Sequence, residues 1–258
     1  MFIDVHAHYE DEKFDTDRDE VIAKITDAGC EAIVDCAQDY ETSLRISEMT
    51  EKYPRLFGAV GIHPHEALSY NNDNINKIKD IILSNKKIVA VGETGLDYHY
   101  DFAPRDVQKE NFRANIELSQ EVNLPLVVHD REAHEDTLMI MNEMRVEPEK
   151  AMIHCFSGSR EMAEIIAKKG WYFSVGGAVT FKNARRIIEA LPVIPNELLM
   201  LETDCPYMTP EPFRGRRNDS SMIPYTAAKI AEVKGIAVEE LYHITNENAK
   251  RFFGLNDL

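Results

Sequence analysis

Short apolar runs alternate with longer amphipathic stretches along most of the chain. Each run is rich in branched and aromatic side chains and ends in polar residues. The runs are largely continuous rather than alternating, which indicates strands buried on both faces. Eight strands are predicted, at residues 2–6, 31–37, 56–63, 88–93, 125–129, 151–156, 171–175 and 197–204.

The stretches between these strands carry apolar side chains at helical spacing. In residues 108–123, Phe112, Ile116 and Leu118 recur while Glu and Gln hold the exposed positions. Further helices are predicted at 19–29, 73–84, 162–170, 184–191, 224–235, 237–245 and 246–254. Eight alternating units predict an α/β fold, a (β/α)8 TIM barrel with residues 1–258 as a single domain. A doubly wound open sheet is the alternative.

Composition narrows the classes of function. A net charge of -16 argues against gripping long DNA duplexes through phosphates, but allows a nucleotide held by metal ions at one small site. The four cysteines form no C-x-x-C pair, which favours a reducing compartment. The first residues do not resemble a signal peptide, and no apolar run reaches bilayer length. We therefore expect a cytoplasmic protein with no membrane partner; a monomer is plausible.

Two histidines, His6 and His8, follow one another at the end of the first predicted strand. Residues two apart on a strand point to the same face, so both imidazoles project together. In a barrel, this end of the strands forms the active site, where two imidazoles can share one cation. Taken alone, the pair also fits two surface histidines.

Four other strand ends carry potential metal ligands: Glu93, His129, His154 and Asp204. An ionisable group after an apolar run is costly to bury unless it is paired or coordinated. Six such residues at one rim exceed the needs of one tetrahedral ion. They predict two divalent ions, magnesium, manganese or zinc, with Glu93 as the bridging carboxylate.

The motifs around these positions resemble, in order and spacing, the TatD family of metal-dependent deoxyribonucleases, a branch of the amidohydrolase-like barrels. They are FIDVHAH (2–8), GIHPH (61–65), GETGLDYHY (92–100), VHDREA (128–133), HCFSG (154–158), LETDCPYMTP (201–210) and NAKRFFG (248–254). The sequence departs from the family pattern at Val5, at Tyr9-Glu10, and at Ser220, where a proline is common. These departures concern packing near the substrate more than the ligands.

The resemblance implies a division of the ligands between two ions. One ion would be held by His6, His8, Glu93 and Asp204, and the other by Glu93, His129 and His154. It also implies exonuclease-type hydrolysis of phosphodiester bonds in DNA, by a water molecule that the two metals activate.

Three further residues are candidates for catalysis or for contacts near the reacting group. Asp204, a candidate metal ligand, is also the candidate general base. Glu202 lies two residues before it, so the two side chains should point to the same face of the strand. Glu202 could then accept a proton, support a metal ligand, or form an interior salt bridge. His63 is a candidate for contact with a phosphate or leaving oxygen. His65, across Pro64, is a weaker candidate for substrate binding. The alternative for both is a rigid loop with local hydrogen bonds.

Four residues are candidates for binding the substrate. The planar fork of Arg131 suits phosphate oxygens, although an ion pair with Glu132 or Asp136 explains it equally well. Arg214 and Arg216 are chosen from the resemblance, against a merely solvated loop. Tyr98 is a candidate for stacking on a base, or for anchoring its loop.

A two-metal phosphodiesterase acting on DNA ends is the leading hypothesis. The alternative is an enzyme with the same metal site that hydrolyses an amide or ester bond instead of a phosphodiester, such as an aminoacyl-tRNA deacylase. A non-catalytic metal-binding scaffold is the third.

Overall fold

The computed structural model describes residues 1–255, and all eight predicted strands are present. The strands are β1 (Phe2–Ala7), β2 (Cys30–Cys36), β3 (Leu56–Val60), β4 (Ile88–Asp97), β5 (Leu126–Arg131), β6 (Ala151–Ile153), β7 (Tyr172–Val175) and β8 (Leu199–Leu201). The helices are α1 (Arg18–Asp27), α2 (Tyr40–Lys52), α3 (Asn72–Ser84), α4 (Arg105–Val122), α5 (His134–Glu143), α6 (Arg160–Lys168), α7 (Arg185–Ala190), α8 (Ile223–Lys234) and α9 (Val238–Phe253).

The strands are hydrogen-bonded in sequence order, from β1 to β8. The segment that follows β8 also meets the end of β1: Ala7 pairs in parallel with Cys205, and the Asp204 N–H donates to the His6 carbonyl at 3.0 Å. A doubly wound sheet would reverse its strand order near the middle. The predicted (β/α)8 fold is therefore confirmed, and the open-sheet alternative is ruled out.

By its internal contacts the chain divides into two compact units. The first unit comprises residues 1–34 and 155–258, and the second comprises residues 35–154. The first thus contains β1, β7 and β8 with α1 and α6 to α9. The second contains β3 to β6 with α2 to α5. The single-domain boundary stays a prediction.

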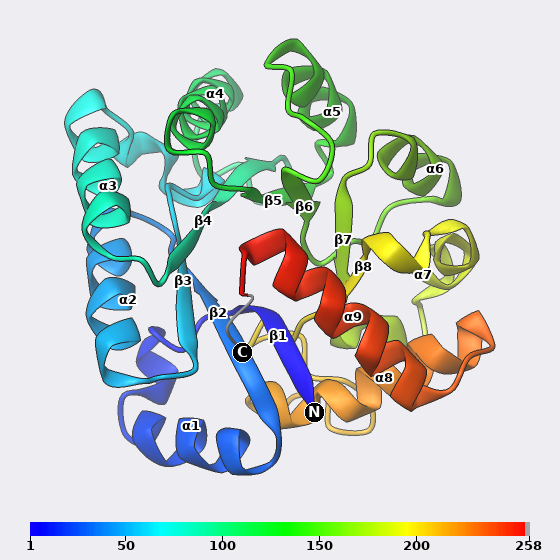
Figure 1. Ribbon diagram of the computed structural model, residues 1–258. Helices are drawn as coiled ribbons and strands as arrows, with labels where there is room; N and C mark the ends of the chain where they lie inside the picture. Colours follow the sequence, from blue (N-terminus) through cyan, green and yellow to red (C-terminus); the bar gives the residue numbers. More distant parts are fainter. Residues whose placement is uncertain (256–258) are drawn as a thin grey trace. The chain divides into compact units, whose positions relative to one another are not determined.

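Helix α9 is one element, so the prediction of two helices at 237–245 and 246–254 is wrong. The polar residues in its middle do not break the helix, because their side chains bind strand backbone. Asn246 accepts from the Ile3 N–H at 3.0 Å, and Asn248 donates to the Leu199 carbonyl at 2.8 Å. Figure 1 shows the result: α9 (red) lies along β1 (blue), from the opposite end of the chain.

The apolar pattern alone does not predict α2. Its buried face contains only two large apolar side chains, Ile46 and Met49. Its start is set instead by Asp39, whose carboxylate accepts from the Thr42 N–H at 2.9 Å, in a capping box. Among residues 1–255, no helix is both long and apolar enough to cross a membrane. Location and oligomeric state stay predictions.

Strand β4 is buried along all ten residues although it carries Glu93 and Asp97. It pairs in parallel with β5, and Gly95 lies opposite His129. Gly95 has a φ of +138°, and a Cβ there would lie 2.0 Å from the His129 carbonyl oxygen. Only glycine permits this approach, which places His129 beside the carboxylates of β4.

Gly95→Ala is expected to lower the free energy of unfolding by about 2–5 kcal/mol, because it adds both backbone strain and a backbone clash. Gly235→Ala is the matched control. Gly235 also has a positive φ, of +68°, but nothing lies within 4 Å of its missing Cβ, so the cost should be only about 1 kcal/mol. Urea unfolding measures both. Equal losses would contradict the role given to the β4–β5 approach.

Candidate metal centre

Three side chains of the second unit meet around β4, β5 and β6. Glu93 and His129 lie within β4 and β5, and His154 directly follows β6, so the predicted end of the fourth strand at residue 93 is four residues too early. Glu93 Oε1 lies 2.8 Å from both His129 Nδ1 and His154 Nε2, and the two nitrogens are 3.2 Å apart. None of the three side chains is more than 14% exposed. Ligands that bind one ion at about 2.0–2.2 Å lie roughly 3 Å from one another. The donor set therefore fits a divalent cation.

Asp97 holds His129 from its other ring nitrogen. Asp97 Oδ2 lies 3.1 Å from His129 Nε2 and 2.8 Å from His65 Nε2. Its Oδ1 accepts from two backbone N–H groups of the following turn. A carboxylate on one imidazole nitrogen fixes the tautomer and leaves the other nitrogen to bind a metal. Asp97 thus orients His129 Nδ1 toward Glu93.

The charges of this cluster favour a cation. Burial alone would raise the pKa of Asp97, but hydrogen bonds from His129, a backbone N–H and His65 hold that pKa well below its ordinary range. Burial alone would lower the pKa of His129, but hydrogen bonds to Asp97 and Glu93 raise it. His129 and His65 therefore lie beside the ionised carboxylate of Asp97.

His63 contacts the same cluster from the start of the 3-10 helix η2 (Pro64–Ser69). Its Nδ1 accepts from the His65 N–H at 3.1 Å, so its proton lies on Nε2, 3.3 Å from Glu93 Oε1. Burial lowers the pKa of His63 to about 4. The ring is therefore neutral near pH 7. Its contact with substrate, and that of His65, stay predictions.

The first unit has its own cluster, formed by His6, His8 and Asp204. The two Nε2 atoms are 3.1 Å apart, and Asp204 Oδ1 lies 3.7 Å from His6 Nε2 and 3.4 Å from His8 Nε2. Asp204 has a left-handed backbone, with φ of +55°, which an aspartate tolerates. Two imidazole nitrogens facing each other with a carboxylate alongside also fit a cation.

Glu10 supports this second cluster. Its Oε1 lies 3.4 Å from His8 Nδ1, on the side of the ring away from His6 and Asp204, and both side chains are almost fully buried. Glu10 therefore contacts the outer ring nitrogen of His8, as Asp97 contacts the outer ring nitrogen of His129, and can fix the orientation of the ring in the same way. From the sequence, Glu10 was recognised only as a departure from the family pattern.

Two of the other departures, Tyr9 and Ser220, form one hydrogen-bonded network with Asp4. Ser220 donates to Asp4 Oδ2 at 2.7 Å, and its N–H donates to the Tyr9 hydroxyl at 2.9 Å. Thr203 Oγ1 donates to the same Asp4 oxygen at 2.6 Å. Burial raises the pKa of Asp4 to about 7 despite these bonds. The network ties β1, which carries His6, to the segment that carries Asp204.

Glu202 is fully buried in the first unit and accepts from the Ser174 hydroxyl of β7. Its role as a proton acceptor stays a prediction.

The arginines after β8 differ in their contacts. Arg217 forms a two-pronged ion pair with Asp17, at 2.8 and 2.6 Å. Arg214 and Arg216 are exposed and lie over the rings of Phe181 and Phe213. Neither has a carboxylate within 4.0 Å among residues 1–255. Their guanidinium donors are therefore available to an anion.

Tyr98 anchors its loop. Its hydroxyl donates to Asp136 at 2.6 Å, and the Arg105 guanidinium covers its ring at 4.1 Å. Base stacking by Tyr98 stays a prediction.

Arg131 is exposed and has no carboxylate partner within the described chain. The two carboxylates predicted as alternative ion-pair partners of Arg131 bind other residues: Glu132 pairs with His99, and Asp136 pairs with Lys109.

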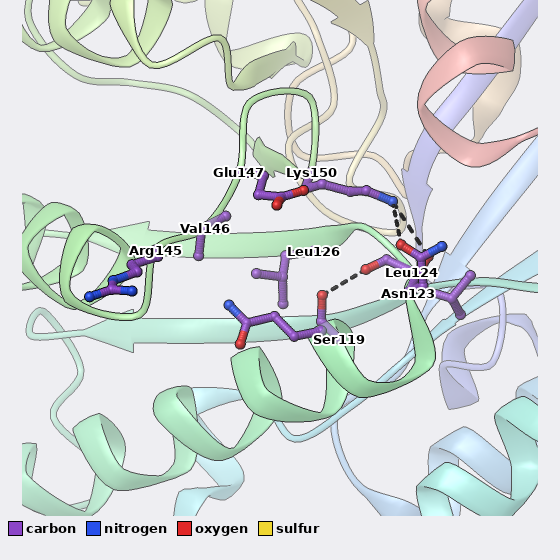
Figure 2. Close-up of a pocket in the computed structure, with 9 residues that line it drawn as sticks. Ser119, Asn123, Leu124, Leu126, Arg145, Val146, Glu147 and Lys150 are labelled. Atoms are coloured by element: carbon purple, nitrogen blue, oxygen red, sulfur yellow. Dashed lines mark hydrogen bonds between the residues drawn. The ribbon is translucent and has the colours of Figure 1, made fainter.

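A separate pocket of the second unit lies at the opposite ends of the strands. Figure 2 shows it between the end of α4, the start of β5 and the turn before β6. Ser119 donates to the Leu124 carbonyl at 2.6 Å, and Lys150 binds the Asn123 side chain at 3.0 Å. No histidine lines it. This pocket is therefore separate from the candidate metal ligands Glu93, His129 and His154.

Fold and ligand clusters together define a metal-dependent hydrolase of the barrel class. The sequence model of the TatD related DNase family matches residues 3–254, and the chain belongs to that family. YabD of Bacillus subtilis (strain 168), an uncharacterized metal-dependent hydrolase, is 45% identical over 256 residues, covering 99% of this chain and 100% of that protein.

Two further relatives support the assignment. The 3′-5′ ssDNA/RNA exonuclease TatD of Salmonella typhimurium is 30% identical over 257 residues, covering 97% of this chain and 98% of that one. The crystal structure of YjjV, a TatD homologue from Escherichia coli K12, superposes with a TM-score of 0.92 at 27% identity over 98% of each chain.

Asp97→Asn is expected to weaken metal binding by about 10–100-fold, because the amide cannot hold His129 in the required tautomer. Calorimetric titration with Mn²⁺ measures the affinity. Asp136→Asn is the control, since Asp136 binds Lys109 and Tyr98 instead of a histidine. Unchanged Mn²⁺ affinity in folded Asp97→Asn would exclude this role.

Proposed function

We propose that this chain is a metal-dependent phosphodiesterase that removes nucleotides from the ends of single-stranded nucleic acid. The observation that carries the proposal is the cluster of Glu93, His129 and His154, whose ligand atoms lie 2.8–3.2 Å apart and are buried. The family match and the Salmonella relative named as an exonuclease support the choice of bond.

The donor count suits two divalent ions. The first unit offers His6, His8 and Asp204, and the second offers Glu93, His129 and His154. Nitrogen and carboxylate ligands admit magnesium, manganese or zinc. The number and identity of the ions, and the bridging role of Glu93, stay predictions. When bound, such ions lower the pKa of water and stabilise charge on a phosphoryl group.

The side chains divide the remaining work. Asp204 is the most exposed member of its cluster, at 16%, which supports a role as acceptor of the proton of an attacking water. Neutral His63 presents an N–H that suits a phosphoryl or leaving oxygen. Arg131, Arg214 and Arg216 offer donors to phosphates without a competing carboxylate within 4.0 Å in the described chain. These free cations favour an anionic substrate over a neutral amide.

Glu93→Gln and Asp204→Asn are expected to lower turnover of a single-stranded oligonucleotide by at least about 100-fold, because each removes a charged ligand. Glu132→Gln, an exposed carboxylate paired with His99, is the control and should keep full activity. The assay crosses Mg²⁺, Mn²⁺ and Zn²⁺ with single-stranded DNA, single-stranded RNA and an aminoacyl ester. Cleavage of the ester alone would overturn the proposal in favour of a deacylase.

Arg214→Gln and Arg216→Gln should each raise KM and reduce the slope of log K against log salt by about 0.7, the value for one lost phosphate contact on a single strand. Arg217→Gln should leave that slope unchanged, because its charge is already neutralised by Asp17. Binding titrations between 50 and 200 mM salt give the slopes. An equal effect from all three arginines would indicate general electrostatic attraction instead.

A further inference from the structure

Two exposed aromatic rings follow β4 in the second unit. Tyr100 is 47% exposed and Phe102 is 62% exposed. Their rings stack with centroids 5.3 Å apart and planes inclined by 26°. A single exposed aromatic residue is ordinary, but a stacked pair forms a rigid apolar plate that attracts a flat partner.

The plate formed by Tyr100 and Phe102 contacts the cluster of Asp97 and His129 through His65. The His65 ring contacts both aromatic rings edge-on, with centroids 5.3 Å from Tyr100 and 4.8 Å from Phe102. The same imidazole is held by Asp97, which also orients the metal-ligand candidate His129. The plate therefore lies one side chain away from the proposed chemistry.

Arg131 supplies a positive charge beside the plate. Its guanidinium lies 4.8 Å from the centre of the Tyr100 ring. It is exposed and has no carboxylate within 4.0 Å among residues 1–255. An aromatic pair next to a free cation matches the two parts of a nucleotide, a flat base and an anionic phosphate.

We propose that this group is a base-stacking subsite: Phe102 stacks on an unpaired nucleobase, Tyr100 backs Phe102, and Arg131 binds the adjacent phosphate. The proposal rests on the phosphodiesterase function given above. Every base has a flat face, so the subsite accepts all bases. A paired base inside a duplex has no free face, so binding there requires an unpaired strand.

The test uses the full-length protein and five-nucleotide DNA strands with phosphorothioate linkages that resist cleavage. Each strand carries the fluorescent base 2-aminopurine at a different position. Stacking on Phe102 should quench one position in the wild type. Phe102→Ala should abolish that quenching and raise Kd about tenfold. Phe102→Tyr keeps a ring and should retain both.

A turnover assay with cleavable strands separates this inference from the function on which it rests. The wild type should show a lower KM for natural bases than for a strand with an abasic sugar at the quenched position, and Phe102→Ala should remove the difference. Leu83→Ala is the matched control: Leu83 is 67% exposed, near the end of α3 that leads into the start of β4.

Two results would overturn the subsite. The first is wild-type quenching, Kd and KM in Phe102→Ala. The second is conversion of a dimer to a monomer by Phe102→Ala without a change in nucleic acid binding, which would make the plate an interface between copies. If the wild type cleaves neither strand but still quenches 2-aminopurine, the phosphodiesterase proposal fails while the stacking contact stands.

Discussion

Much of the second unit depends on how the buried carboxylate of Asp97 is satisfied. One oxygen binds His129 and His65, and the other accepts two backbone N–H groups. A buried carboxylate with fewer partners would take up a proton, and His129 would lose its orientation. The same group therefore fixes the tautomer of a ligand, the ring of His65 and the path of the chain after β4.

In the first unit, different residues orient the candidate metal ligands. Glu10 lies beside His8, and Asp4 joins β1, the strand of His6, to the segment of Asp204. In both units, a carboxylate lies beside one nitrogen of an imidazole whose other nitrogen faces further candidate ligands. Preorganisation of this kind lets a cation bind without moving the backbone.

The sequence predicted the strands and the ligand candidates because both follow from one local rule. An apolar run followed by histidine or a carboxylate indicates the last part of a buried strand or the residues just after it, as at His129 in β5 and Asp204 after β8. It did not predict Asp97 or Glu10, since the ordinary reading of either is a solvated loop residue. Asp97 could have been found from the alternation of side chains along a strand: it lies four residues after Glu93, so both side chains point to the same face if the strand continues. The continuity of α9 depends on contacts between Asn246 and β1, which no local pattern contains.

The hydrogen bonds among Tyr9, Ser220 and Asp4 have an evolutionary consequence. Replacing either hydroxyl-bearing residue alone would leave a buried polar group unsatisfied, at a cost of about 1–3 kcal/mol. A lineage that carries this triad is therefore expected to exchange positions 9 and 220 together. Paired substitution at these two sites would mark a subgroup of the family more reliably than either residue by itself.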